Sequence, residues 1–396
     1  MTTRPLKTVV LDDDPTGTQS ATGVRVLLAW DRDVLERTLR EVDSVYVQTN
    51  SRALDEAAAV ALVTSVRDDA LAAAARLGAG VRFVLRGDST PRGHVFAETE
   101  VFAGPDDVVL FVPAFPAGGR TTVDGVHLVR TAEGDVPAGE TEYAADPVFG
   151  FTSSRLSDYV REKSAREPFT GPLDQAPPGS VVVPDVRDDA DVAALAAQVG
   201  EGVVVRCAAP LAAALAGVAS TGLLPRPLRP GHPRVLVVCG SHTAGAREQL
   251  AALGGTQHVL PTAAALADPV AAGRELAARA GAGLAGGEVV VVATERVRSA
   301  DHGTLAHGEK VMRALVEAVR VLRPGLDAVV TKGGITAAEV ARTGLGATAA
   351  VVEGQVAPGV SVWRLEVDGR DLLQVVVPGN VGGPGAIADA VGALGR

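Results

Sequence analysis

The chain has 396 residues, 47% of them hydrophobic, and a formal net charge of -10 at pH 7. This length exceeds a single ordinary core and favours two domains. The negative charge argues against a nucleic-acid-binding protein, because such proteins carry a basic surface. It does not exclude an anionic substrate, since a phosphate or carboxylate site needs only a few local donors.

The cysteines and the hydrophobic pattern indicate the compartment. Cys207 and Cys239 lie far apart and outside any metal-binding spacing, which fits a reducing environment. Residues 1–7 hold no apolar signal segment, and no apolar run of the sequence reaches transmembrane length. We therefore expect a cytoplasmic protein with no nucleic-acid or membrane partner. Its oligomeric state is left open, with a homodimer among the alternatives.

The first half of the chain repeats a short valine-rich run, a polar or glycine-bearing break and an alanine-rich helical stretch. This alternation predicts an α/β fold whose N-terminal sheet is doubly wound, mostly parallel and Rossmann-like. In such sheets, ligands bind beyond the carboxyl ends of the strands. We expect strands at residues 7–13, 44–49, 81–86, 108–113, 180–184 and 202–206, and helices at 55–77 and 188–199.

Residues 218–234 contain four prolines and little periodicity, and we interpret them as a linker. We expect one domain over 1–217 and a second α/β domain over 235–396, in which the strand–helix pattern restarts. The second domain should contain strands at 234–239, 288–293 and 327–332, helices at 243–253, 307–322 and 336–343, and a β-hairpin over 360–377.

Three consecutive carboxylates, Asp12, Asp13 and Asp14, end the first expected strand. Such a triplet repels itself and is costly to bury, so its place at the ligand edge favours a function over a simple strand cap. In a kinase, one carboxylate accepts a hydroxyl proton or holds Mg²⁺. In a haloacid-dehalogenase-type phosphatase, Asp12 and Asp14 would be nucleophile and acid, although no convincing later acidic pair for Mg²⁺ follows a strand.

Polar clusters follow three further strands of the first domain. Arginine can grip a carboxylate through two parallel hydrogen bonds, while aspartate and serine suit sugar-like hydroxyls. A single cluster would read as a solvated turn, but four clusters at successive strand tips indicate a substrate site. The candidate residues are Ser51 and Arg52, then Arg86, Asp88, Ser89 and Arg92, then Arg120.

Three junctions in the second domain place glycines between a strand and a helix. Glycines let the backbone approach a phosphate, and the first amides of the following helix point at it. A serine at such a junction is also an ordinary helix cap, and the GxxxxGK[ST] order of a Walker loop is absent. Together the junctions favour nucleotide binding. The candidate residues are Ser241, then Lys332, Gly333, Gly334 and Thr336, then Gly379, Asn380 and Gly382.

In number and order, these motifs resemble those of the four-carbon acid sugar kinase family over nearly the whole chain. Asp13-Asp14-Pro15-Thr16-Gly17 is similar to the family's aspartate-aspartate-x-threonine-glycine signature. Asp88-Ser89-Thr90-Pro91-Arg92-Gly93 is similar to its aspartate-serine-threonine-x-arginine-glycine motif. The loop from Pro113 to Arg120 and the three glycine junctions also match. Pro15, Pro91, Arg86 and Val377-Pro378 depart from common family residues, which suggests a subgroup.

The resemblance implies an ATP-dependent kinase that phosphorylates a tetronate such as threonate, erythronate or a 3-oxo derivative. It implies that the first domain holds the sugar acid and the second holds ATP, with Mg²⁺ as a cofactor whose ligands are unknown. The catalytic candidates are Asp13 as general base, Asp14 as its support, and Asp88, which with Ser89 would meet the hydroxyls. The acid's carboxylate would lie against Arg92 and either Arg52 or Arg86. The phosphatase and a non-catalytic sugar-acid or nucleotide-binding protein remain the alternatives.

Overall fold

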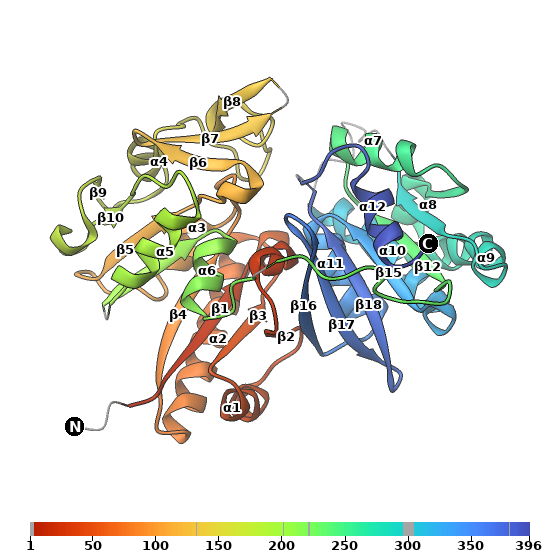
Figure 1. Cartoon of the computed structure of the whole chain (residues 1–396), viewed down its shortest axis with the longest axis horizontal. Coiled ribbons are helices and arrows are strands. Elements are labelled where there is room, and N and C mark those ends of the chain that lie inside the picture. Colours follow the sequence, from red (N-terminus) through yellow and green to blue (C-terminus); the bar gives the residue numbers. More distant parts are fainter. Residues whose placement is uncertain (1–3, 132, 201, 221, 296–304, 380) are drawn as a thin grey trace. The chain divides into compact units, whose positions relative to one another are not determined.

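The computed structural model divides the chain into two compact units, Met1–Ala219 and Ser220–Arg396. The structure describes residues 4–131, 133–200, 202–220, 222–295, 305–379 and 381–396. Each unit combines a β-sheet with flanking helices (Figure 1). None of the described helices combines the length and the apolar character that spanning a membrane requires.

The main sheet of the first unit is built from strands that run parallel. In sheet order they are β2 (Arg25–Leu27), β3 (Ser44–Gln48), β1 (Leu6–Asp12), β4 (Gly80–Arg86), β11 (Val203–Cys207), β5 (Val108–Val112), β10 (Val181–Val182) and β9 (Pro168–Phe169). From β1 the chain moves to β3 on one side and then to β4 on the other. This is the doubly wound arrangement that the sequence predicts, so the polar segments after β1, β3 and β4 meet at one edge.

The helices of the first unit follow local sequence cues. Helix α2 (Glu56–Arg76) begins after Asp55, whose carboxylate accepts a hydrogen bond from a first-turn amide over 2.8 Å. The helix buries Ala59, Val63 and Val66 at the three- and four-residue spacing of one face. The other helices are α1 (Arg32–Glu41), α3 (Val95–Thr99), α4 (Leu156–Lys163), α5 (Asp189–Gln198) and α6 (Ala209–Leu215).

A small antiparallel sheet in the first unit was not predicted from the sequence. It consists of β6 (Arg120–Val123), β7 (Val126–Thr131) and β8 (Gly134–Pro137). The turn between β6 and β7 is Asp124-Gly125, with φ of 51° and 77°. An aspartate-glycine pair between β-branched residues favours such a turn, because both positions require a positive φ. The sequence therefore contained the signal for this hairpin.

The second unit has a mixed sheet with a parallel centre. In sheet order its strands are β13 (Gln257–Leu260), β14 (Val290–Thr294), β12 (Val235–Cys239), β15 (Ala328–Lys332), β18 (Arg370–Val377), β17 (Val360–Val367) and β16 (Ala349–Ala357). The first five are parallel, and β17 runs antiparallel to both neighbours. The predicted hairpin is confirmed as β17–β18, whose turn Asp368-Gly369 has φ of 51° and 71°.

The strands of this second sheet pack in a buried core with the surrounding helices. Val237, Val330 and Val375 lie in the three central strands and are fully buried, and Ile387 belongs to the same core cluster. Such packing brings the carboxyl ends of β12, β15 and β18 to one edge. The helices are α7 (Ala244–Leu253), α8 (Thr262–Ala267), α9 (Pro269–Ala285), α10 (Leu305–Leu322), α11 (Gly334–Glu339) and α12 (Ala386–Ala393).

The proline-rich segment expected to be a linker is hydrogen-bonded to the second unit. The amide of Leu224 donates to the carbonyl of Gln355 over 2.7 Å, and the amide of Leu228 donates to the carbonyl of Ala393 over 2.8 Å. These bonds fasten the segment to β16 and to the end of α12. The expected boundaries, 1–217, 218–234 and 235–396, stay predictions.

Candidate functional site

Three buried carboxylates extend from the tip of β1, and one arginine faces all of them. Asp12, Asp13 and Asp14 are at most 2% exposed. Arg86 ends the neighbouring strand β4, in register with Asp12. Its Nη1 lies 3.0 Å from Asp12 Oδ1, 3.4 Å from Asp13 Oδ1 and 3.2 Å from Asp14 Oδ1. Buried carboxylates persist only when such a partner compensates their lost hydration.

The segment after the triplet packs closely against its carboxylates. The Asp14 carboxylate accepts hydrogen bonds from the Thr16 amide, over 2.7 Å, and from the Thr16 hydroxyl. A side chain at Gly17 would collide with the Asp12 carboxylate, so only glycine fits there. Burial raises the pKa of Asp12 to about 7 in spite of the opposing charge of Arg86. Asp12 therefore differs electrostatically from an exposed carboxylate.

A second buried arginine, which the sequence analysis missed, holds Asp13 from the other side. Arg206 in β11 donates from Nη2 to Asp13 Oδ2 over 3.1 Å and from Nη1 to Glu98 Oε2 over 2.6 Å. Arg206 and Glu98 are each 2% exposed. Gly87 leaves room for the guanidinium, since a Cβ there would meet it. An arginine inside a valine-rich strand was the overlooked signal.

The carboxylate of Asp88 joins the residues after β4 to the β1 cluster. Arg92 Nε donates to Asp88 Oδ2 over 2.8 Å, and Arg52 Nη1 lies 3.4 Å from the same oxygen. Arg52 also forms an ion pair with Asp14, and its Nε lies 3.7 Å from Asp13 Oδ1. Burial would raise the pKa of Asp88, but the two arginines and hydrogen bonds outweigh it and hold that pKa below its ordinary value.

Two residues that were not predicted from the sequence orient the side chain of Arg92. Its guanidinium lies 5.1 Å from the ring centroid of Tyr143, and its Nη1 lies 3.5 Å from Asp146 Oδ2. Stacking on an aromatic face and pairing with carboxylates fix the plane of a guanidinium. Arg92 is therefore oriented before any ligand arrives.

The remaining substrate candidates lie in the same unit with other contacts. Ser51 is fully buried, and its hydroxyl accepts from Thr49 Oγ1 over 3.4 Å. The carbonyl of Ser89 contacts Nε2 of buried His127 over 2.8 Å. Burial, with a smaller contribution from the charge of Arg120, lowers the pKa of His127 to about 4. Arg120 begins β6 and donates to the Gly118 carbonyl. The roles of Ser51, Ser89 and Arg120 in binding stay predictions.

The three glycine junctions of the second unit meet at the edge formed by β12, β15 and β18. The Ser241 hydroxyl lies 3.2 Å from the Thr243 hydroxyl, which donates to the carbonyl of Gly379 over 3.2 Å. A Cβ on Gly240 would collide with the hydroxyl of Thr336, so the first and second junctions are in contact. The structure therefore brings together segments that lie up to 138 residues apart, from Ser241 to Gly379.

Lys332 ties the second junction to the third. Its side chain is fully buried, and Nζ donates to the carbonyls of Pro378 over 2.6 Å and Val381 over 3.2 Å. Burial lowers the pKa of Lys332 to about 8. Gln249, a residue missed by the sequence analysis, donates to the carbonyl of Gly382 over 3.0 Å.

Gly333, Gly334 and Asn380 are the other candidate residues of these two junctions. Gly333 has φ of 104°, and Gly334 begins α11. Asn380 lies outside the described residues. The contacts described for the junctions hold their loops to one another, and their roles in nucleotide binding stay predictions.

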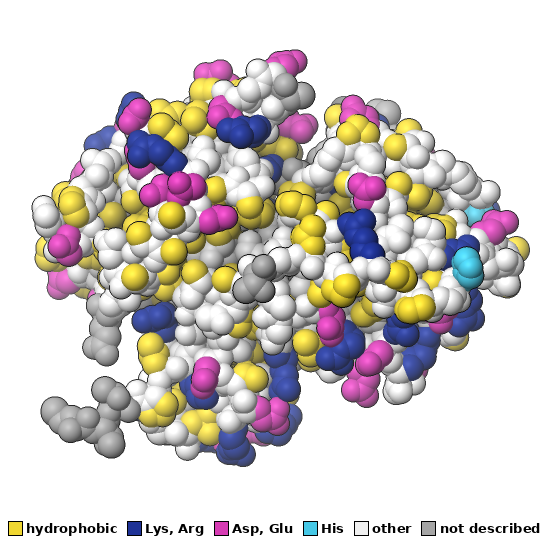
Figure 2. Space-filling view, viewed as in Figure 1, with side chains coloured by type: hydrophobic (Ala, Val, Ile, Leu, Met, Phe, Trp, Pro, Cys, Tyr) yellow, Lys and Arg dark blue, Asp and Glu magenta, His cyan; other side chains and the backbone are white. Residues whose placement is uncertain are grey.

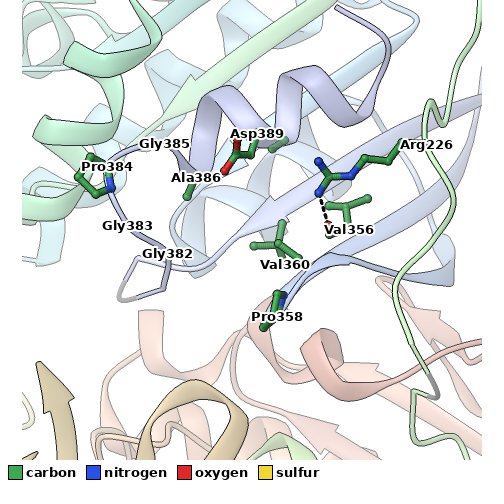
Figure 3. A pocket seen from close by; sticks show the side chains of 12 residues that line it. Arg226, Val356, Pro358, Val360, Gly382, Gly383, Pro384, Gly385, Ala386 and Asp389 are labelled. Atoms are coloured by element: carbon green, nitrogen blue, oxygen red, sulfur yellow. Dashed lines mark hydrogen bonds between the residues drawn. The ribbon is translucent and has the colours of Figure 1, made fainter. Parts of the chain in front are cut away.

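A cavity of about 350 Å³ opens beside the third junction, within the second unit. Figure 3 shows its walls: the glycine-rich loop with Pro384 on one side, Asp389 on α12, Val360 and Pro358 at the β16–β17 turn, and Arg226. Arg226 donates a hydrogen bond to the carbonyl of Val356. Of the residues that line this cavity, only Gly382 was among the candidate residues predicted from the sequence.

Charge on the described surface is mixed, and the described residues form no evident metal site. On the face drawn in Figure 2, basic and acidic side chains are interspersed, without a broad basic area among the described residues visible there. In the part of the chain that the structure describes, no group of three or more histidine, cysteine, aspartate or glutamate side chains is arranged to hold a metal ion. Arginines occupy the places around Asp12, Asp13 and Asp14 that a cation would need.

Comparison with known proteins assigns a class to each unit. Residues 8–215 match the model of a sugar-binding N-terminal domain, and residues 236–387 match that of a nucleotide-binding C-terminal domain. The protein is thus a two-domain α/β protein whose halves match a sugar-binding and a nucleotide-binding domain model. The chain belongs to the four-carbon acid sugar kinase family, which confirms the resemblance drawn from its motifs.

Similar proteins include a D-threonate kinase of Bordetella bronchiseptica, 32% identical over 65% of this chain and 65% of the relative. A D-erythronate kinase of Heliobacterium modesticaldum is 33% identical over 62% of this chain and 60% of the relative. The chain thus aligns with less than two thirds of the length of these relatives. A solved structure from Haemophilus influenzae is similar in fold, with a TM-score of 0.62 at 18% identity, and the match covers 98% of this chain and 100% of that one. A second, from Salmonella typhimurium, has a TM-score of 0.68 at 16% identity, and the match covers 97% of this chain and 98% of that one. This likeness confirms the two-domain α/β fold class.

Proposed function

We propose that this protein is an ATP-dependent kinase that transfers the γ-phosphoryl group of ATP to a hydroxyl of a four-carbon sugar acid. The observation that carries the proposal is the cluster of Asp13, Asp14 and Asp88 around Arg52, in the unit that matches the sugar-binding model. In this cluster, carboxylates that can accept a proton from a hydroxyl lie beside arginines that can bind a carboxylate. A polyhydroxylated acid offers both groups.

Asp13 is the proposed general base. Its Oδ2 accepts a hydrogen bond from Arg206 over 3.1 Å, whereas Oδ1 has longer contacts, 3.4 Å to Arg86 and 3.7 Å to Arg52. Oδ1 is therefore the oxygen better placed to take a proton from the attacking hydroxyl. Asp14, fixed by Thr16, would support the charge balance around it.

The acid itself would be held by the residues that follow β3 and β4. Arg92, oriented by Tyr143, presents a planar fork suited to a carboxylate. Asp88 is held as a carboxylate and can accept hydrogen bonds from substrate hydroxyls. The relatives are named for D-threonate and D-erythronate, so a tetronate is the substrate class we propose.

ATP would bind to the second unit, at the edge where the three glycine junctions meet. Ser241, Gly333 and Gly379 border one another there, and the unit matches the nucleotide-binding model. Mg²⁺ would stabilise the phosphates of ATP during transfer. The described residues do not fit a metal site built by the protein alone, so we propose that Mg²⁺ enters with the nucleotide.

Coupled measurement of ADP release against a panel of four-carbon acids tests this proposal. We expect ADP release that requires a tetronate and that Asp13→Asn lowers about a hundredfold or more, while exposed Asp174→Asn leaves it unchanged. Release of phosphate from sugar phosphates without ATP would instead favour the phosphatase that uses Asp12 and Asp14. Binding of the acid and of ATP without turnover would favour a non-catalytic binding protein.

A further inference from the structure

The loop between β4 and α3, residues 87–94, carries Asp88 and Arg92 but forms neither a helix nor a strand. Residues 88–91 of this loop are buried. Backbone carbonyls that are buried outside helices and sheets need hydrogen-bond donors from elsewhere in the fold. Two such donors are side chains that lie far from the loop in the sequence.

The first donor is His127 in β7. Its ring is fully buried, with Nε2 2.8 Å from the carbonyl oxygen of Ser89 and Nδ1 3.1 Å from the hydroxyl of Thr122. With its lowered pKa, the ring is neutral at pH 7 and carries one N–H. A carbonyl oxygen can only accept, so Nε2 donates to Ser89 and Nδ1 accepts from the Thr122 hydroxyl. The two hydrogen bonds therefore fix both the tautomer and the orientation of the ring.

The second donor is Tyr159 in α4, which is 2% exposed. Its hydroxyl donates to the carbonyl of Pro91 over 2.7 Å. Its ring stacks on Phe111 with a centroid distance of 5.7 Å and meets the edge of Phe151 at 5.5 Å. Aromatic packing on two sides holds the ring, so the hydroxyl is held in place for Pro91.

The elements that carry these two donors are joined to each other. The amide of His127 donates to the carbonyl of Ser154, just before α4, over 2.8 Å, and the amide of Leu156 donates to the carbonyl of Gly125 over 2.9 Å. Figure 1 shows the small sheet β6–β8 and α4 together in the upper part of the first unit. The loop is therefore held at two carbonyls by one connected support.

The two held carbonyls flank the residues that are proposed to bind the acid. Thr90 lies between them and donates from its hydroxyl to the carboxylate of Asp88. Arg92 follows Pro91 directly. A shift of either carbonyl would therefore move Asp88 and Arg92 relative to each other.

We propose that His127 and Tyr159 are positioning residues of the sugar-acid site, which hold this loop so that Asp88 and Arg92 meet the acid together; the inference rests on the proposed kinase function. Neither positioning side chain touches the acid. Their effect is to fix the loop before binding, so that less conformational entropy is lost when the acid binds.

Calorimetric titration of the full chain with D-threonate and D-erythronate, each with and without ADP, and separately with ATP, tests this role. Tyr159→Phe removes one hydroxyl and keeps the stacked ring, whereas His127→Leu removes the donor of the histidine. His127→Gln restores an N–H donor and is the conservative variant. Thr99→Val is the matched control, because Thr99 is fully buried and its hydroxyl donates to the carbonyl of Val95 within α3 over 2.6 Å. Circular dichroism and thermal unfolding establish which variants are folded.

We expect Tyr159→Phe to raise the dissociation constant of the acid about threefold to tenfold and His127→Leu about tenfold or more. His127→Gln should recover most of the affinity for the acid, Thr99→Val should bind it normally, and ATP should bind every variant as it binds the wild type. Should His127→Leu fail to fold, Tyr159→Phe and His127→Gln still decide the matter.

If the wild type binds the acid and folded Tyr159→Phe binds it equally well, the role of Tyr159 is overturned while the kinase proposal stands. Equal weakening of acid and ATP binding, or a folded His127→Gln no better than His127→Leu, would overturn the positioning role in the same way. If the wild type binds neither acid with or without ADP, the kinase proposal itself fails and the positioning role fails with it.

Discussion

Arg206 donates a hydrogen bond from Nη2 to Oδ2 of Asp13 over 3.1 Å, although the two residues are 193 positions apart in the sequence. Both are 2% exposed, and Glu98 binds the other arm of the guanidinium. Removing one partner of a buried ion pair leaves an uncompensated charge and costs about 3–5 kcal/mol. The contact therefore ties the fold of the first unit to the position of the proposed base.

Arg206→Met should lower both stability and turnover. We expect a loss of about 3 kcal/mol in the free energy of unfolding and a decrease in kcat of about a hundredfold, since Asp13 loses its orientation. Arg206→Lys should recover part of kcat, and KM for the acid should change less than kcat. Urea unfolding and steady-state kinetics check this, with exposed Arg187→Met as control. A stable variant with normal kcat would show that Arg206 does not position Asp13.

Asp12 predicts a pH dependence of stability. Its pKa is raised from 3.8 to about 7 by burial, against the charge of Arg86. Between these values the unfolded chain has lost the proton and the folded protein keeps it, so the free energy of unfolding falls as pH rises through this window. Relative to Asp12→Asn, wild-type stability should fall by up to about 1.4 kcal/mol per pH unit and then level off above about pH 7. Urea unfolding of both proteins from about pH 5 to 8 measures this difference, and a constant difference would contradict the prediction.

Lys332 predicts a dependence of the opposite sign. Burial lowers its pKa from 10.5 to about 8, so between these values the folded protein has released a proton that the unfolded chain still holds. Stability should therefore rise with pH from about 8 toward 10 in the wild type relative to Lys332→Met. Exposed Lys310→Met serves as control and should follow the wild type. Parallel curves of stability against pH for the wild type and Lys332→Met would contradict this prediction.

Gly333 predicts a backbone effect on nucleotide binding. Its φ of 104° is strained for any residue with a side chain, so Gly333→Ala should shift the loop that borders Ser241. We expect the dissociation constant of ATP to rise about tenfold while affinity for the acid stays unchanged. Gly392→Ala, in α12 with open space around it, is the matched control and should bind ATP normally. Calorimetric titration with each ligand decides the matter.

Local patterns in the sequence were sufficient for much of the fold and part of the site. Valine-rich runs and helix caps such as Asp55 act within a few residues, so β1, β4, α2 and the β17–β18 hairpin were predictable. Motif order led to the resemblance to the family. Because parallel strands end at a common edge, the sequence predicted that the polar clusters after β1, β3 and β4 share one edge. It did not predict that Arg86 pairs with Asp12, Asp13 and Asp14.

Contacts between distant segments were not predictable in this way. Arg206 and Glu98 reach Asp13 only because β11 lies beside β4 in the sheet, and strand order cannot be read from one sequence. Tyr143 and Asp146 approach Arg92 from an irregular segment without periodicity. The cavity wall combines residue 226 with residues 356–358 and 360 and with residues 382–386, 389 and 390, which no local pattern links.

Phosphorus NMR of the reaction mixture is the most direct test of the proposed transfer. With wild-type protein, ATP, Mg²⁺ and a four-carbon sugar acid, we predict that a phosphomonoester signal of the acid appears as the γ-phosphate signal of ATP disappears. In the same mixture Asp13→Asn should form that signal at least about a hundredfold more slowly. Loss of the γ-phosphate to inorganic phosphate alone, or no consumption of ATP with any tetronate, would contradict the proposed function.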